Sequence, residues 1–279
     1  MCALRMPGML TTLALIAAAG TALADCRDEW ICVDAVDQGG NVELRARNLG
    51  DFPITYTLKI SGTPQLQIDG PDTVTRTLAP RQSEQVMRLP GTGPAGDGQY
   101  RVSFDWTVGD KDAVHDDGHL YSLPYSSGQR YRVLQGYGSR FSHTGLEEFA
   151  IDFDMPIGTP VHAARAGVVA RVEEGNSRGC WEDGCGKFAN FVVILHSDGT
   201  TGEYYHLMQN GAIVSVGETV SQGQKIAYSG NTGHTTMPHL HFAVYRATDW
   251  GNTQSIPVRF RSIDGIIRKP RRGGRYQAL

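Results

Sequence analysis

The chain has 279 residues, which is enough for two domains. Apolar residues make up 40% and charged residues 20%, the proportions of an ordinary soluble globular protein. The net charge of −3 argues against a dedicated nucleic-acid-binding protein, so no nucleic acid is expected among its partners. The 34 glycines and 13 prolines indicate a turn-rich, mostly β protein.

Residues 1–24 are typical of a secretory signal peptide. Arg5 provides a positive start, Met9 to Ala19 is almost wholly apolar, and Ala22-Leu23-Ala24 is a small-x-small cleavage site. We therefore expect export to the periplasm or the medium, with no transmembrane span left after cleavage. Two alternatives remain, an uncleaved membrane anchor and a lipid-modified Cys26.

Four cysteines remain once Cys2 leaves with the signal peptide, and they form two close pairs, Cys26 with Cys32 and Cys180 with Cys185. Even counts at short spacing in an exported chain predict a disulfide within each pair. The alternative is one zinc site built from all four thiolates. Neither pair has the two-residue gap of a zinc knuckle, so disulfides are the preferred interpretation.

Residues 25–110 are expected to form an immunoglobulin-like β-sandwich. Apolar and polar residues alternate from Asn41 to Arg47 and from Thr55 to Ile60, and Gly, Pro and Asp fill the gaps. No cluster here could carry chemistry, so a spacer or positioning module with an unknown partner is expected. The predicted strands are Ile31–Ala35, Asn41–Asn48, Ile54–Ser61, Thr73–Leu78, Ser83–Leu89 and Tyr100–Val108.

Residues 111–128 are polar and turn-rich, and we interpret them as a linker to a second domain at 129–279. His115 and His119 lie among aspartates in this segment. They could bind a metal, but a solvated loop is the preferred interpretation.

The most informative stretch of the second domain is centred on His239-Leu240-His241. In a β-strand the side-chain period is two, so both histidines should point to one face and Leu240 and Phe242 to the other. The turn signal Gly230–Gly233 precedes this predicted strand. Two imidazoles on one face can divide a task, one binding a metal while the other handles a proton.

Several separated motifs in the second domain occur in the order typical of one family. Together they resemble the M23 family of zinc metallopeptidases, the lysostaphin/LytM type of peptidoglycan endopeptidase. The resemblance covers roughly residues 130–260 and leaves out the N-terminal module. The motifs are Ser142-His143-Thr144-Gly145, Ala150-Ile151-Asp152-Phe153, Gly158-Thr159-Pro160-Val161, Ala166-Gly167-Val168-Val169, Tyr204-Tyr205-His206-Leu207, Ser229-Gly230-Asn231-Thr232-Gly233 and Pro238-His239-Leu240-His241-Phe242.

The resemblance implies a role for each of five positions. His143 and Asp152 match the family's first two zinc ligands, and His241 matches the third. His206 and His239 match the two histidines that stand beside the reacting water without binding the metal. One Zn²⁺ per chain is therefore expected, with a fourth coordination position left open.

The spacing of the first two ligands departs from the family pattern. Nine positions separate His143 from Asp152 (152 − 143 = 9), more than is usual in the family. Asp154 is therefore an alternative ligand, because strand parity does not separate it from Asp152. The flanking Ile151 and Phe153 match the motif around Asp152, which we prefer.

The resemblance further implies an antiparallel β-sheet peptidase domain that hydrolyses peptide cross-links between the stem peptides of bacterial peptidoglycan. A D,D-endopeptidase used in wall remodelling is the leading hypothesis. The alternatives are a catalytically inactive wall-binding or amidase-activating module, and a secreted bacteriolytic protease that acts on Gly-rich bridges.

Two further segments have open interpretations. The stretch Asn176–Lys187, which holds the second cysteine pair, could form a wall of the substrate groove or a stabilised surface loop. The tail from Arg268 to Arg275 holds five basic residues. It could meet an anionic wall polymer, although such charge runs are usually solvated.

Overall fold

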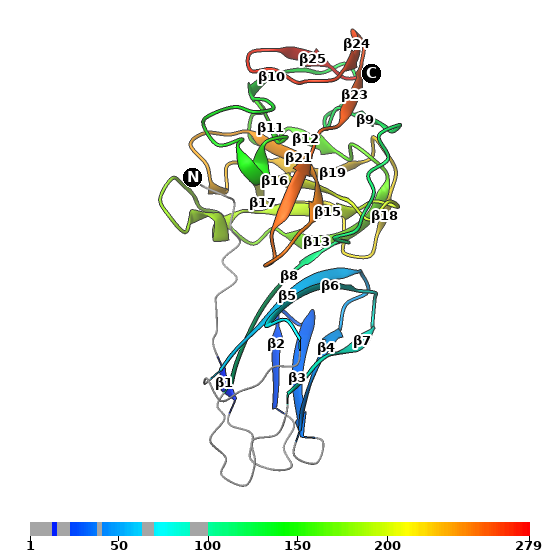
Figure 1. Ribbon diagram of the computed structural model, residues 1–279. Helices are drawn as coiled ribbons and strands as arrows, with labels where there is room; N and C mark the ends of the chain where they lie inside the picture. The colour runs from blue at the N-terminus through cyan, green and yellow to red at the C-terminus, as the bar shows by residue number, and fades with distance from the viewer. Residues whose placement is uncertain (1–12, 16–22, 38–40, 63–69, 90–99) are drawn as a thin grey trace. The chain divides into compact units, whose positions relative to one another are not determined.

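The computed structural model describes residues 13–15, 23–37, 41–62, 70–89 and 100–279, and it is almost entirely β (Figure 1). The described residues contain two short 3₁₀ helices, η1 (Gly145–Glu147) and η2 (Cys185–Phe188), and no α-helix. Accordingly, no helix in this part of the chain could cross a membrane. Most of the expected signal peptide lies outside the described residues.

The chain divides into two compact units. One comprises the described residues up to Lys111 together with Ala247–Asn252, and the other comprises Asp112–Arg246 with Thr253–Leu279. Strand β2 (Leu23–Arg27) runs across the expected cleavage position after Ala24, so cleavage there stays a prediction.

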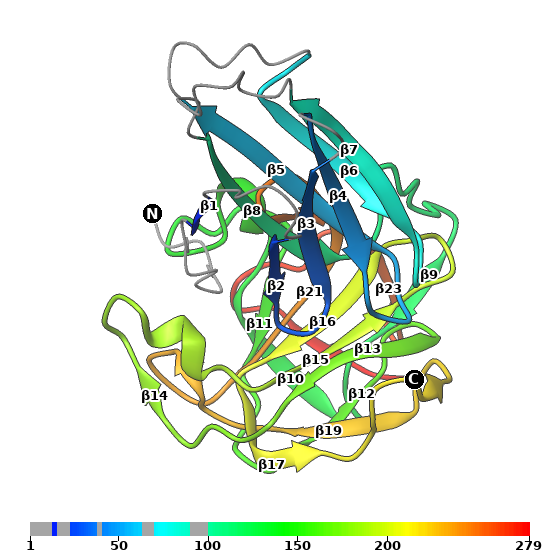
Figure 2. The same cartoon turned by 90° about the horizontal axis from the view of Figure 1, so that it is seen from below.

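The first unit contains two four-stranded antiparallel sheets, which Figure 2 shows as separate layers. Burial alternates along the central strand of one sheet, as expected when one face meets a core. Every strand predicted for this module is present, with small differences at the ends. The immunoglobulin-like topology stays a prediction. The strand order in the first sheet is β1 (Leu13–Leu15), β8 (Tyr100–Val108), β5 (Ile54–Gly62) and β6 (Thr73–Leu78). The order in the second sheet is β2, β3 (Ile31–Asp37), β4 (Val42–Asn48) and β7 (Ser83–Leu89).

Both predicted disulfides are present. Cys26 and Cys32 are bonded across the pairing of β2 with β3, and Cys180 is bonded to Cys185. The prediction from cysteine spacing is therefore confirmed, and a zinc site built from the four thiolates is excluded.

Part of the expected linker has regular structure. Strand β9 (Leu120–Ser122) lies within it and pairs in parallel with β23 (Arg259–Ser262) of the second unit. The ring of His115 lies 3.1 Å from the hydroxyl of Tyr121, measured from Nε2, and a backbone amide of this segment bonds to Asp198. These residues therefore pack within the second unit.

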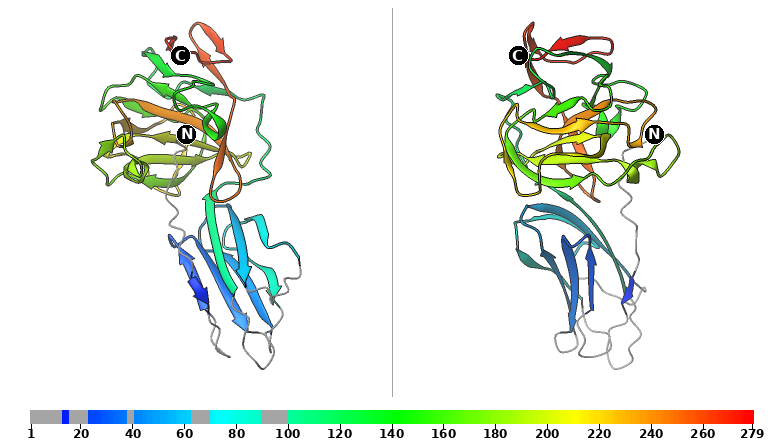
Figure 3. Two further views of the ribbon diagram at one scale, coloured as in Figure 1. Left: turned by 60° about the vertical axis from the view of Figure 1, so that its left-hand side comes forward. Right: turned by 180° about the vertical axis from the view of Figure 1, so that it is seen from behind.

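The second unit is organised around a nine-stranded sheet with β21 (Leu240–Ala247) near its middle. Strands β16 (Thr201–Tyr205) and β11 (Ile151–Phe153) pair with β21, the orange strand labelled in Figure 1; Figure 3 gives two further views of the ribbon. The remaining members of the sheet are β18 (Thr219–Val220), β13 (Gly167–Glu173), β15 (Phe191–Leu195), β10 (Arg130–Gln135), β25 (Arg275–Gln277) and β22 (Thr253–Ile256).

Smaller sheets complete the second unit. They are β12 (Pro160–His162), β19 (Lys225–Ser229) and β17 (Leu207–Ala212); β14 (Gly179–Cys180) with β20 (Gly233–His234); and β24 (Gly265–Ile267) with β23 and β9.

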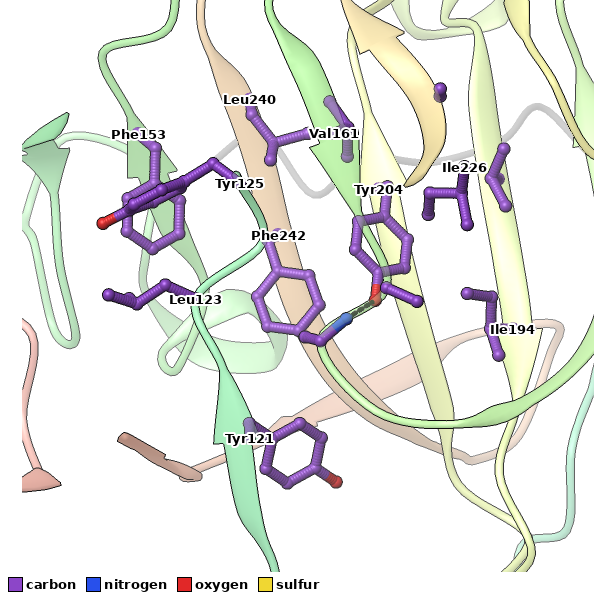
Figure 4. Packing of buried hydrophobic residues seen from close by; sticks show 14 of the residues in the cluster. Tyr121, Leu123, Tyr125, Phe153, Val161, Ile194, Tyr204, Ile226, Leu240 and Phe242 are labelled. Atoms are coloured by element: carbon purple, nitrogen blue, oxygen red, sulfur yellow. Dashed lines mark hydrogen bonds between the residues drawn. The ribbon is translucent and has the colours of Figure 1, made fainter. Parts of the chain in front are cut away.

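The hydrophobic core of the second unit lies against one face of β21. Leu240 and Phe242 point into it and pack near Tyr204 (Figure 4). The hydroxyl of Tyr204 accepts a hydrogen bond from the backbone amide of Ala164 at 2.7 Å, so its burial leaves no polar group unpaired. Since side chains alternate along a strand, His241 projects from the opposite face. His239 lies just outside β21, in an isolated bridge with Gly230, and both histidines approach Oδ1 of Asp152, so they share a side as predicted although only His241 belongs to the strand.

Candidate metal centre and active site

Two of the predicted ligands lie opposite each other on adjacent strands. Asp152 of β11 pairs with His241 of β21, and Oδ1 of the carboxylate lies 2.9 Å from Nδ1 of the imidazole. Both side chains are buried. Burial acts to lower the pKa of His241, but its hydrogen bonds to Asp152 and Glu147 outweigh that effect and raise the pKa to about 10.

His143 approaches the same carboxylate from the segment that precedes η1. Its Nε2 lies 3.2 Å from Oδ1 of Asp152, but neither ring nitrogen is aligned with a hydrogen-bond partner among the described residues. The ring is 1% exposed, so water does not replace the missing partners. The ligand atoms of His143, Asp152 and His241 all lie within 4.8 Å of one another. An orphaned, buried imidazole facing a carboxylate and a second imidazole is an arrangement that fits a metal ion.

The orientation of Asp152 is set by Gln135, the last residue of β10. Its Nε2 donates to Oδ2 of Asp152 at 2.6 Å and to the hydroxyl of Ser142 at 2.8 Å. Oδ2 is thereby occupied and Oδ1 is left to face the histidines. Burial acts to raise the pKa of Asp152, but the charge of His239, the nearby ring of His143 and the hydrogen bond with His241 outweigh it and hold the pKa well below its usual value.

His206 and His239 form the second half of the cluster, with ring centroids 4.6 Å apart. Nδ1 of His206 lies 2.7 Å from the carbonyl oxygen of Thr232, and Nδ1 of His239 lies 2.8 Å from that of Met237. A carbonyl only accepts, so each Nδ1 carries a proton in its contact, and Nε2 is the ring nitrogen left for other partners. Nε2 of His239 is 3.7 Å from Oδ1 of Asp152.

His206 is held in an unusual backbone conformation between β16 and β17. Its φ is 64°, in the left-handed region that non-glycine residues rarely adopt, and the residue is buried. Burial, followed by the charges of His239 and His241, keeps the pKa of His206 well below its usual value. The ring is therefore a neutral imidazole at neutral pH.

The turn expected before the His-x-His strand provides the carbonyl that binds His206. Gly233 has a φ of 86°, and a Cβ there would lie 2.6 Å from Cβ of Ala189, so glycine is required on both counts. Next to it, the hydroxyl of Thr232 donates to the carbonyl of Leu207 at 2.7 Å. This bond fixes the turn against the start of β17 and holds the Thr232 carbonyl in place.

All five predicted site residues come together, while the alternative ligand stays apart. Strand β11 ends at Phe153, and Asp154 is not among the clustered ligand atoms. Another cluster of metal-binding residue types in the described chain joins Cys180, Glu182 and Cys185, and its two sulfurs form a disulfide. His162 lies outside the cluster, where it contacts the hydroxyl of Ser126 and the carbonyl of Gly223.

A stack of three rings borders the cluster. Phe141 lies two positions before His143, and its ring stacks on Trp181 at 5.3 Å with an interplanar angle of 14°. The ring of Trp181 also contacts His234, with ring centroids 4.1 Å apart. Trp181 lies inside the loop closed by Cys180–Cys185, so the disulfide-bonded loop is joined to two segments of the site. Its interpretation as a wall of a substrate groove stays a prediction.

Two buried residues at the site were missed by sequence reasoning. The hydroxyl of Tyr245 donates to Oε2 of Glu147 at 2.6 Å and lies 3.2 Å from Nε2 of His241. Nothing in the sequence pairs residues that lie so far apart in the chain. Tyr245 reads as part of an apolar strand and Glu147 as a surface charge. The only available signal is that Tyr245 shares the strand face of His241.

Comparison with known proteins agrees with this geometry. Residues 147–255 match the family described as Peptidase family M23. The peptidoglycan DD-endopeptidase ShyA of Vibrio cholerae is 34% identical over 143 residues, which cover 46% of this chain and 30% of the relative. The glycyl-glycine endopeptidase ALE-1 of Staphylococcus capitis is 35% identical over 137 residues, which cover 48% and 35% respectively.

A solved structure of the antimicrobial peptidase lysostaphin from Staphylococcus simulans is also similar. It is 31% identical, with a TM-score of 0.34, over 45% of this chain and 47% of that one. The matched part spans about a third of the length of the two curated relatives. The family match includes Asp152, His206, His239 and His241 and begins just after His143. Residues 147–255 of this chain therefore match Peptidase family M23.

Proposed function

We propose that the protein is a zinc-dependent endopeptidase that hydrolyses peptide cross-links of bacterial peptidoglycan. The observation that carries the proposal is the convergence of His143, Asp152 and His241 beside two histidines that are tied to backbone carbonyls. ShyA and ALE-1 are both endopeptidases, which supports the reaction class, and ShyA acts on peptidoglycan, which supports the substrate polymer.

The donor set fits zinc in particular. Two imidazoles and one carboxylate are ligands typical of a catalytic zinc site, which keeps one position open. His143 and Asp152 would bind through Nε2 and Oδ1, and His241 through Nδ1, the atoms that face one another. When bound, zinc supplies a Lewis acid that polarises the scissile carbonyl and favours ionisation of water near neutral pH.

His206 and His239 would handle the protons of the reaction. Each has Nδ1 committed to a carbonyl, so each offers Nε2 as the acceptor for a proton from the attacking water. Once protonated, the same nitrogen can donate to the oxyanion or to the leaving amine. The depressed pKa of His206 keeps this acceptor neutral before the reaction.

We propose a D,D-endopeptidase on direct stem-peptide cross-links, acting after export in wall remodelling. Cleavage of Gly-rich bridges is the second candidate, and the similarity to a glycyl-glycine endopeptidase favours it. A domain that binds the wall without cutting it is the third. The intact set of five residues supports an enzyme over this last alternative.

Mass spectrometry of digested peptidoglycan distinguishes the three. The zinc-loaded mature protein is incubated with sacculi that have direct cross-links and, separately, with sacculi that have glycine bridges. We expect cross-linked dimers of the first to become monomers, with the His143→Ala protein inactive as control. Products cut only within glycine bridges would support the second candidate. Tight binding to sacculi without any product would refute the endopeptidase proposal.

A further inference from the structure

The nitrogen of His241 that faces away from Asp152 is also engaged. We infer that Tyr245 and Glu147 are positioning residues, which hold the imidazole so that Nδ1 presents its lone pair to the metal. This inference rests on the proposed zinc site, but it concerns how the protein prepares that site rather than the reaction itself.

The three side chains form a directed chain of hydrogen bonds. The hydroxyl of Tyr245 lies 2.6 Å from Oε2 of Glu147, and a carboxylate can only accept, so the phenol is the donor in this contact. Its oxygen is then an acceptor for Nε2–H of His241, which is 3.2 Å away. Oε2 of Glu147 is itself 3.6 Å from the same nitrogen.

The direction of the chain fixes the tautomer of His241. With the proton on Nε2, the neutral ring has its lone pair on Nδ1, the atom 2.9 Å from Oδ1 of Asp152. A metal ligand needs that lone pair, and a donor bond from the opposite nitrogen also sets the ring's rotation and increases its basicity.

Burial makes the arrangement specific. Tyr245 and His241 are 2% and 3% exposed, and Glu147 is 8% exposed although it belongs to the short η1 segment. An acidic side chain is rarely buried without a purpose, because removing its charge from water is costly. In the described structure its short contacts are with Tyr245 and His241, so its place in the fold is tied to the proposed ligand.

The neighbouring strand provides a matched control pair. Tyr205 lies opposite His241 in the register of β16 with β21, and its hydroxyl donates to Oε2 of Glu203 at 2.8 Å. This tyrosine–glutamate pair is buried on the same sheet face, and it makes no hydrogen bond to His241. Removing it should perturb packing without affecting the tautomer.

The test measures zinc affinity by competition with a chromogenic chelator. Tyr245→Phe and Glu147→Gln should each weaken zinc binding by about 10- to 100-fold, the usual cost of losing an outer-shell partner of a metal-bound histidine. Tyr205→Phe and Glu203→Gln should stay within about threefold of the parent. Both residues act through the same chain of hydrogen bonds. The zinc affinity of the Tyr245→Phe/Glu147→Gln double variant should therefore fall by less than the product of the two single effects.

A second readout reports on the ring itself. In the zinc-loaded protein, long-range ¹H–¹⁵N spectra should show His241 protonated at Nε2, with a proton protected from exchange with water. Tyr245→Phe should remove that protection, while Tyr205→Phe should preserve it. Circular dichroism of each variant checks that the fold is retained.

The outcomes separate this inference from the proposed function. A parent protein that binds zinc but releases no peptide would refute the endopeptidase proposal and leave the inference intact. Wild-type affinity in both Tyr245→Phe and Glu147→Gln would overturn the inference. Equal losses of zinc affinity in all four single variants would also overturn it, because they would show a general effect of packing. A parent protein that binds no zinc would overturn it as well.

Discussion

His241 lies directly across from Asp152 in the pairing of β11 with β21, with 2.9 Å between Nδ1 and Oδ1. The identity of this ligand pair therefore depends on strand register. A slip of one residue would turn His241 to the core face and bring Leu240 or Phe242 in its place. The apolar face of β21, packed into the core, fixes the register and with it the geometry of the site.

The first prediction concerns the carboxylate ligand. Asp152→Asn should lose zinc affinity by more than the roughly 10- to 100-fold expected for an outer-shell change, because a ligand charge is removed. Asp154→Asn is the matched control and should keep the parent's zinc content. Metal analysis after dialysis gives both values. Loss of zinc only in Asp154→Asn would show that Asp154, and not Asp152, is the ligand.

The second prediction concerns the two non-ligand histidines. His206→Ala and His239→Ala should each lower kcat by about 10²-fold or more, the usual contribution of a general acid–base or oxyanion-stabilising group. Zinc content should not change, because neither ring is among the clustered ligand atoms. His162→Ala, altered outside the site, is the control and should keep full activity. Unchanged cleavage in both site variants would refute their role.

The third prediction compares the effects of removing each of the two disulfides. Their sequence separations are 5 and 6 residues, so replacing either pair by serines should lower the free energy of unfolding of its own unit by about 2 kcal/mol. Only the Cys180→Ser/Cys185→Ser variant should raise KM, because its loop carries Trp181 against Phe141. Denaturant unfolding and steady-state kinetics measure the two effects. The idea of a groove wall fails if KM is the same in both double variants.

The fourth prediction concerns acid stability and a histidine outside the site. Burial, aided by the charge of Arg165, lowers the pKa of His196 from 6.5 to about 3. Between these values the unfolded chain binds a proton at this position and the folded chain does not. Unfolding is therefore increasingly favoured as pH falls below 6.5, and the effect stops growing near pH 3.

His196→Gln should remove this contribution, so its stability should fall less steeply with acidification than that of the parent. The difference in slope can reach about 1.4 kcal/mol per pH unit. Denaturant unfolding at several pH values between 6.5 and 4 checks this. Parallel curves for the two proteins would show that His196 is already charged in the folded state.

Local patterns predicted much of the fold. Period-two alternation located the strands of the first unit, because each buries one face. The same parity placed His239 and His241 together and Leu240 with Phe242 in the core. The ligand set required the family resemblance, since no local pattern specifies that β11 pairs with β21 or that His143 reaches Asp152 from the segment before η1.

Long-range contacts explain what sequence reasoning missed. Gln135 orients Asp152 from β10, and Glu147 reaches Tyr245 from a segment 98 positions away. Neither belongs to a motif, and each side chain acquires its role only when the sheet forms. Strand β9 was missed for the same reason: it is a short run that pairs in parallel with β23, far away in the chain.

The left-handed backbone of His206 has an evolutionary consequence. The conformation costs on the order of 1–3 kcal/mol, which glycine would not incur and asparagine would incur less. Selection for stability alone would therefore replace this histidine, and only selection for hydrolysis would retain it. Among descendants of this gene that have lost the activity, the position of His206 should drift toward glycine or asparagine sooner than that of His143.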